Sequence, residues 1–140
     1  MYTKGMNEAP EKPECLAIMI CDQVYRDERT KKLVLAGVFS NLHAREFPYR
    51  HPSMTVLFTL SGGRGEYSMS LILENADTGE EVHSLSGPLR LDEPEKVVDF
   101  TVQMMGVRFP KSGKHEVVIK IDGEIIKQRP FMVTKVEVKS

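Results

Sequence analysis

The chain has 140 residues, of which 41% are hydrophobic and 28% charged, and its 19 basic and 20 acidic residues leave a formal net charge of −1. This length suits one domain whose core needs neither a disulfide nor a metal. The charge balance lacks the basic surplus of most nucleic-acid-binding proteins, and no apolar run is long enough for a membrane-spanning helix. We therefore expect a single globular domain without nucleic-acid or membrane partners.

The first segment, residues 1–14, reads MYTKGMNEAPEKPE and is polar, with prolines and glutamates that offer little to bury. Such a composition is typical of a flexible N-terminal tail. It also lacks the apolar stretch of a secretory signal, so we expect a cytoplasmic location. The folded domain is predicted to cover residues 15–140.

After the tail, apolar residues recur with a period of two, which predicts strands and not helices. Three segments are apolar on both faces, as in strands that are covered on both sides: Leu16–Cys21, Leu33–Phe39 and Met54–Leu60. In other segments apolar and polar residues alternate, as in strands with one buried and one solvent-exposed face: Glu66–Glu74, Val97–Met105, His115–Asp122 and the C-terminal residues 135–139.

Clusters of glycine, proline and aspartate separate these segments and predict turns between them. They are Gly62–Gly65, Asp77–Gly79, Asp92–Pro94, Pro110–Gly113 and Asp122–Gly123. The whole pattern amounts to about eight strands without a helix, which predicts an all-β, immunoglobulin-like antiparallel β-sandwich.

The stretch CDQVYRDERTKKLVLAGVF, residues 21–39, offers the strongest candidate for chemistry, because Cys21 stands next to Asp22. A nucleophilic cysteine needs a nearby base and a positive environment, and no histidine is close in sequence. We therefore predict a hairpin with an exposed charged turn at residues 26–31 and a buried Cys21 thiol. Cys15 would lie about 20 Å from Cys21 on the same strand, too far for a disulfide. No catalytic residue is assigned, and no enzyme is expected.

Metal and cofactor sites find little support in the sequence. His43 and His51 are eight positions apart, whereas a metal site needs three or four converging ligands. The carboxylates are spread over several turns beside basic residues, which indicates solvated charges and not a calcium site. His115 follows a turn and is predicted to hydrogen-bond the backbone there. We expect no metal and no cofactor.

A long loop, residues 41–53, is the most interesting predicted surface. It carries residues of the kinds found at binding sites, namely His43, Arg45, Tyr49, Arg50 and His51. One interpretation makes these five residues an interaction site. The other makes the loop a crossover that packs its aromatic residues on the sheet edge and leaves the arginines in water.

Several motifs together resemble a bacterial family of uncharacterised proteins, known only as a domain of unknown function. The motifs are AIMICDQV, then LVLAGVFSNL, then FP, and finally FPKSGKHEVVIKIDGEIIKQRPFMV. The resemblance covers most of the chain, from Cys15 to residue 138. It implies an immunoglobulin-like β-sandwich, and it implies no catalytic residues.

These observations favour a non-catalytic binding or protein-interaction module. The predicted contact is the 41–53 loop or an exposed strand edge, with an unidentified protein or a second copy of the chain as partner. The alternative is a sandwich that binds a small ligand, namely calcium, a lipid or a carbohydrate.

Overall fold

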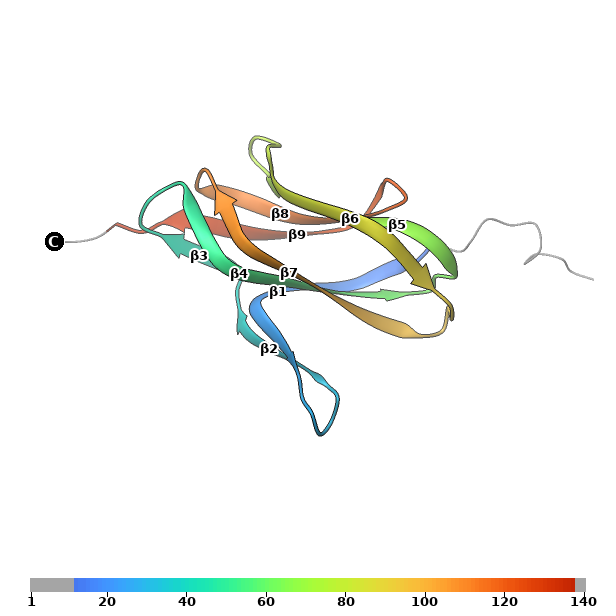
Figure 1. The fold of residues 1–140 in the computed structure, drawn as a ribbon. Helices are drawn as coiled ribbons and strands as arrows, with labels where there is room; N and C mark the ends of the chain where they lie inside the picture. The colour runs from blue at the N-terminus through green and yellow to red at the C-terminus, as the bar shows by residue number, and fades with distance from the viewer. Residues whose placement is uncertain (1–11, 138–140) are drawn as a thin grey trace, which may run out of the picture.

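A computed structural model describes residues 12–137, which form nine strands and no helix (Figure 1). One sheet has the order β2-β1-β4-β7, with bounds β1 Glu14–Arg26, β2 Leu33–Val38, β4 Tyr49–Ser61 and β7 Val97–Phe109. The other has the order β3-β9-β8-β5-β6, with bounds β3 Asn41–Ala44, β5 Gly65–Asn75, β6 Glu81–Leu91, β8 Gly113–Ile121 and β9 Glu124–Lys135. The predicted all-β sandwich is confirmed. Within these residues no helix is long and apolar enough to cross a membrane.

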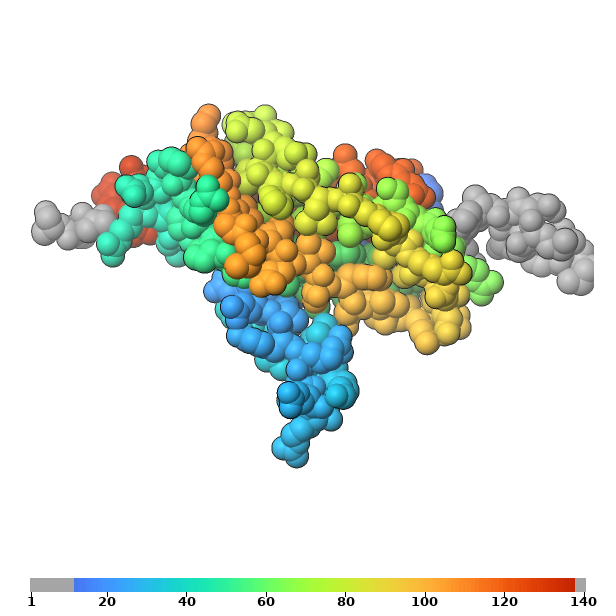
Figure 2. All heavy atoms as spheres, in the orientation of Figure 1, coloured from blue at the N-terminus to red at the C-terminus, as the bar shows by residue number. Residues whose placement is uncertain are grey.

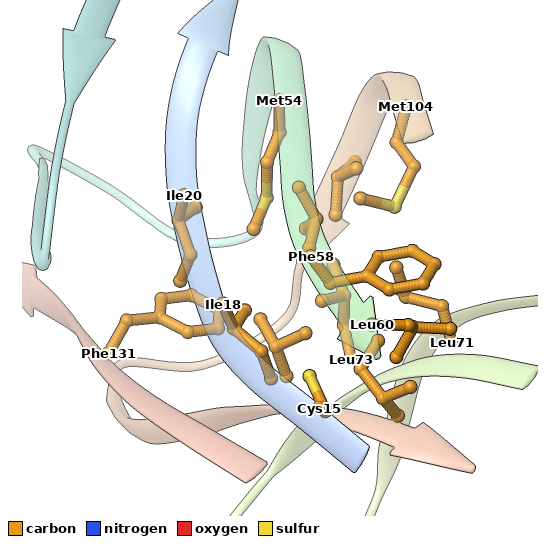
Figure 3. Packing of buried hydrophobic residues seen from close by; sticks show 14 of the residues in the cluster. Cys15, Ile18, Ile20, Met54, Phe58, Leu60, Leu71, Leu73, Met104 and Phe131 are labelled. Atoms are coloured by element: carbon orange, nitrogen blue, oxygen red, sulfur yellow. The ribbon is translucent and has the colours of Figure 1, made fainter. Parts of the chain in front are cut away.

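The core lies between the two sheets and follows from the alternation of the strands. On β4, four residues two positions apart are fully buried: Met54, Val56, Phe58 and Leu60. They meet buried side chains of β1, β5, β7 and β9 (Figure 3): Ile18, Ile20, Leu71, Leu73, Met104 and Phe131. Each such side chain contributes about 1.5–3 kcal/mol by leaving water, which explains why neither a metal nor a disulfide is needed.

The predicted loop at residues 41–53 is wrong, because most of it is strand. Residues 41–44 form β3, and β4 begins at Tyr49. A four-residue strand is too short to reveal its alternation, and only its pairing with β9 makes it a strand. That pairing is parallel, so the expectation of an entirely antiparallel sandwich is also corrected. The extra strand raises the count from about eight to nine.

The structure differs from the sequence prediction at the C-terminal strand and at the N-terminal tail. The last strand, β9, begins directly after the Asp122–Gly123 turn and ends at Lys135, so the predicted strand at residues 135–139 is wrong for its described part. Residues 138–140 lie outside the described chain. Residues 1–11 of the predicted tail also lie outside it, while Pro13 is buried and β1 already begins at Glu14.

The predicted hairpin is confirmed, but the prediction that its second strand is covered on both sides is wrong. None of the six residues of β2 is buried, because the hairpin leaves the sandwich. β1 pairs with β4 only as far as Cys21, whereas its pairing with β2 continues to Arg26. Residues 22–38, here called the arm, therefore project from the four-stranded sheet (Figure 1, Figure 2). The carboxylate of Asp27 accepts hydrogen bonds from the backbone N–H groups of Arg29 and Thr30 in the turn. These bonds lower the pKa of Asp27 and fix the tip.

Candidate functional site

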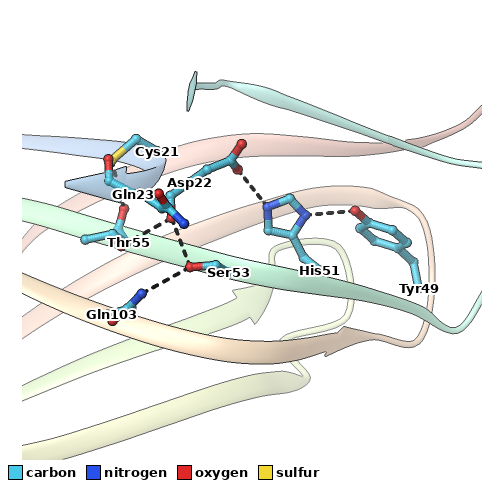
Figure 4. A network of polar contacts seen from close by, with 8 residues as sticks. All are labelled: Cys21, Asp22, Gln23, Tyr49, His51, Ser53, Thr55 and Gln103. Atoms are coloured by element: carbon cyan, nitrogen blue, oxygen red, sulfur yellow. Dashed lines mark hydrogen bonds and ion pairs between the residues drawn. The ribbon is translucent and has the colours of Figure 1, made fainter. Parts of the chain in front are cut away.

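A network of polar side chains occupies the base of the arm, where β1 separates from β4 (Figure 4). Oδ1 of Asp22 lies 2.9 Å from Nε2 of His51, and Nδ1 of His51 lies 2.8 Å from the Tyr49 hydroxyl. The backbone carbonyl of Asp22 accepts hydrogen bonds from Ser53 and Thr55, at 3.1 and 3.4 Å. Asp22 thus contacts β4 through both its side chain and its backbone.

Local sequence explains why Asp22 can lie there. Gly37 on β2 faces Asp22 and has a φ of +72°, and an added Cβ would lie 2.6 Å from Oδ2 of Asp22. Only glycine provides both the positive φ and the space. The side chain of Phe39 then packs edge-on against the His51 ring, with centroids 5.5 Å apart. Gly37 and Phe39, at and just after the end of β2, therefore flank the Asp22–His51 contact, while the Asp22 side chain stays 52% exposed.

Burial sets the electrostatics of the groups around this network. Partial burial and the nearby Asp22 carboxylate raise the pKa of Tyr49. Burial, and to a lesser extent Asp22, also raises the pKa of Cys21. Cys21 is fully buried, and its Sγ lies 3.3 Å from the carbonyl oxygen of Gln23 and 3.8 Å from that of Thr55. It therefore lacks the exposure and positive surroundings of a nucleophile.

The five residues of the predicted interaction loop do not form one site. Tyr49 and His51 lie two positions apart on β4 and belong to the network. Arg50 points the other way and donates to the backbone oxygen of Gly106 on β7, at 2.9 Å. His43 on β3 and Arg45 after it are exposed, and no recorded contact joins them to the network. The contact of Asp22 with His51 has no signal in the sequence, because 29 residues separate them.

The other predicted roles can be compared directly with the structure. Nδ1 of His115 lies 2.9 Å from the carbonyl oxygen of Gly113, which confirms its predicted backbone contact. Cys15 and Cys21 are both free thiols, as predicted. Within residues 12–137, no three His, Cys, Asp or Glu side chains are grouped so that they could hold a metal ion.

Two hollows follow one another between the arm and β7. The hollow near the tip, about 550 Å³, is lined by arm residues and by the start of β7. The one near the base, about 320 Å³, is lined by residues 23–25 of the arm and by Thr55, Thr101 and Gln103. We call both together the arm groove. Its tip end is the notch between arm and body in Figure 2.

Comparisons with known proteins assign the chain to a family but indicate no biochemical activity. The family model described as "Family of unknown function (DUF6941)" matches residues 16–134. No curated protein matches the chain. Two solved structures of a β-glucosidase from Listeria innocua, one in complex with isofagomine, are 13% identical to it, with TM-scores of 0.47 and 0.48. They cover 98% of this chain, which spans only 18% of theirs. The family match covers most of the sequence, and the chain therefore belongs to this family of unknown function, DUF6941.

Proposed function

We propose that this chain is a non-catalytic protein-interaction module that binds its partner through the arm. The observation that carries the proposal is strand β2, whose sequence is LVLAGV. All six residues are apolar, yet none of them is buried. Val34 and Val38 are 47% and 51% exposed, and Tyr25, which pairs with Val34, is 53% exposed. Exposed apolar patches of this kind mark protein interaction sites.

The backbone of β2 supports the same proposal. β2 stands at the end of its sheet and pairs only with β1 among the described strands. Its outer edge therefore presents unpaired N–H and C=O groups, to which another chain can add a strand. The partner can be an unidentified protein or a second copy of this chain. The predicted alternative contact, the exposed His43 and Arg45, carries less apolar surface and ranks behind the arm.

A non-catalytic role is supported by the burial of the Cys21 thiol at the base of the arm. The tyrosine–histidine–aspartate chain there links the arm to β4, and the nearby Ser53 hydroxyl donates to the backbone carbonyl of Asp22. We also propose that the protein is cytoplasmic, uses neither nucleic acid nor a membrane as partner, and has an immunoglobulin-like arrangement of its sandwich.

Site-specific photo-crosslinking in the native cell tests this function. A photoreactive phenylalanine analogue at Val34 should give protein adducts of defined mass. The matched control carries the analogue at Ile125, which is 53% exposed at the start of β9. Adducts that appear equally at both positions, or at neither, would show that the arm is not a contact surface.

A second candidate function is carbohydrate binding, in line with the small-ligand alternative. A hollow of about 640 Å³ on β5 and β6 is lined by hydrogen-bonding side chains, among them Ser68, Ser86, Arg90 and Asp122. Thermal unfolding with a panel of glycans tests it, because a ligand that binds the folded state raises the midpoint. Calcium and lipid belong in the same screen. An unchanged midpoint with every ligand would contradict this candidate.

A further inference from the structure

We propose that the arm groove binds an extended, acidic segment of a partner protein that carries apolar side chains. This inference rests on the proposed function and specifies the chemistry of the partner. It depends on three properties of the groove: its apolar lining, its basic residues without an ion-paired carboxylate in the described chain, and its course along β7. One of these basic residues, Arg26, donates a hydrogen bond to the backbone oxygen of Lys31, at 2.7 Å.

The apolar lining comes from three strands. Leu33 and Leu35 of the arm face Leu57 of β4 and Val97 and Val98 of β7 across the tip end of the groove. Leu57 alternates with the core residues on either side of it, so it points to the outer face of the sheet, where it is only 8% exposed. Val97 is 61% exposed, and Leu33 and Leu35 are half-buried. An occupant with apolar side chains would remove mainly the surface of these last three residues from water.

The charge of the groove is basic on the arm side. Arg26, Lys31 and Lys32 line it, and Asp99 is the single acidic residue of the tip end. Asp99 already accepts a hydrogen bond from the Thr59 hydroxyl, at 2.7 Å. No ion pair with a described carboxylate involves any of the three basic residues. Complementary charge on a partner steers its approach and fixes its register, so the partner segment is acidic.

The course of the groove favours an extended chain. Its two hollows are lined in turn by residues 97–99 and by Thr101 and Gln103 of the same strand. Seven residues of a strand span roughly 20 Å. A segment of similar length, lying along β7, would contact the apolar residues at the tip end of the groove and the polar Thr101 and Gln103 at its base end. Its carboxylates would lie beside the lysines of the arm.

Selection from a phage-displayed library of random peptides of about ten residues, on the immobilised full chain, tests the proposal. We expect enriched peptides to combine Asp or Glu with apolar residues. The double variant Lys31→Glu/Lys32→Glu should weaken the best of them by about tenfold at low salt, and less at high salt. It should also select basic peptides instead.

Matched controls separate the groove from the general charge of the molecule. The variant Lys111→Glu/Lys114→Glu reverses exposed Lys111 in the β7–β8 connection and exposed Lys114 at the start of β8, and it should leave peptide binding unchanged. Val97→Ser should weaken it, whereas Ile125→Ser, at a similarly exposed apolar residue, should not. Circular dichroism spectra identical to that of the parent chain confirm that each variant is folded.

Three outcomes would overturn the inference. Enriched peptides without acidic residues would contradict the charge argument, and binding that survives both lysine substitutions would place the site elsewhere. A dimer in light scattering that Lys31→Glu/Lys32→Glu dissociates would make a second copy the occupant. In each case crosslinking at Val34 still decides separately whether the arm is an interaction surface.

Discussion

Nε2 of His51 lies 2.9 Å from Oδ1 of Asp22, across the point where β1 leaves β4. The histidine side chain is 11% exposed and the aspartate 52%. This pair links the base of the arm to β4, beside the hydrogen bonds that the Asp22 carbonyl accepts from Ser53 and Thr55. The position of the proposed binding surface therefore depends on two residues that are far apart in sequence.

Removing either partner of this pair should destabilise the protein. We expect Asp22→Ala to lower the free energy of unfolding by about 1–2 kcal/mol, since it leaves the buried His51 nitrogen without a partner. In a double-mutant cycle with His51→Ala, the coupling energy should be about 1 kcal/mol. Urea unfolding measures both. Glu81→Ala, at an exposed carboxylate, serves as the control with a cost below about 0.5 kcal/mol. A coupling energy of zero would contradict the pair.

Gly37→Ala should cost more stability than Gly79→Ala. Both glycines have a positive φ, +72° and +76°, but a Cβ would lie 2.6 Å from Asp22 at the first and meet nothing within 4 Å at the second. Gly79→Ala therefore reports the backbone strain alone, about 1 kcal/mol. The excess at Gly37 should shrink in an Asp22→Ala background, which removes the carboxylate. Equal losses at the two glycines would show that the close approach is unimportant.

Acid should destabilise the protein through His115. This residue is fully buried, its Nε2 has no hydrogen-bond partner among the described residues, and burial lowers its pKa. Below about pH 6.5 the unfolded chain binds a proton at this position while the native protein does not, so stability falls as the pH falls.

The matching measurement is urea unfolding between about pH 7 and 5. His115→Phe should reduce the slope by up to about 1.4 kcal/mol per pH unit, the value for one proton, whatever its effect on absolute stability. Val34→Ala, which changes an exposed residue without a titratable group, should leave the slope as it is. An unchanged slope in His115→Phe would mean that another group binds the proton.

Arg129 should contribute to the association of the two sheets. It lies on β9, and its guanidinium donates to the carbonyl oxygen of Ile18 on β1 and to the Ser40 hydroxyl, both at 3.0 Å. We expect Arg129→Ala to cost about 1–3 kcal/mol, because hydrogen bonds from a charged donor are lost. Arg108→Ala, at an exposed arginine without a recorded hydrogen bond, is the control. Similar costs at both positions would argue against the bridging role.

The thiols of the native protein should react slowly. Burial is the main cause that raises the pKa of both Cys15 and Cys21, and only the thiolate attacks a disulfide reagent. Labelling at neutral pH should be at least about tenfold slower than in urea. A cysteine introduced at the exposed Val34 should react at the unfolded rate. Rapid native labelling of Cys21 would reopen the question of catalysis.

The sequence alone predicts the all-β class, the hairpin and most of the core. Alternation is a local property of the chain, because successive side chains of a strand point to opposite faces. It therefore identifies Leu71 and Leu73, in the alternating segment Glu66–Glu74, as strand residues without knowledge of their neighbours. Gly123 and the residues around it likewise predict their turn from local backbone preference.

Only the tertiary structure decides which strands meet. β3 is a strand because its backbone pairs with that of β9, which is far from it in the sequence. The pairing of Asp22 with His51 depends on the register of β1 against β4, and the arm groove depends on where those strands separate. Sheet order, register and twist are set by packing across the whole sandwich, so the sequence pattern around Asp22, His51 and Lys31 contains no local signal of them.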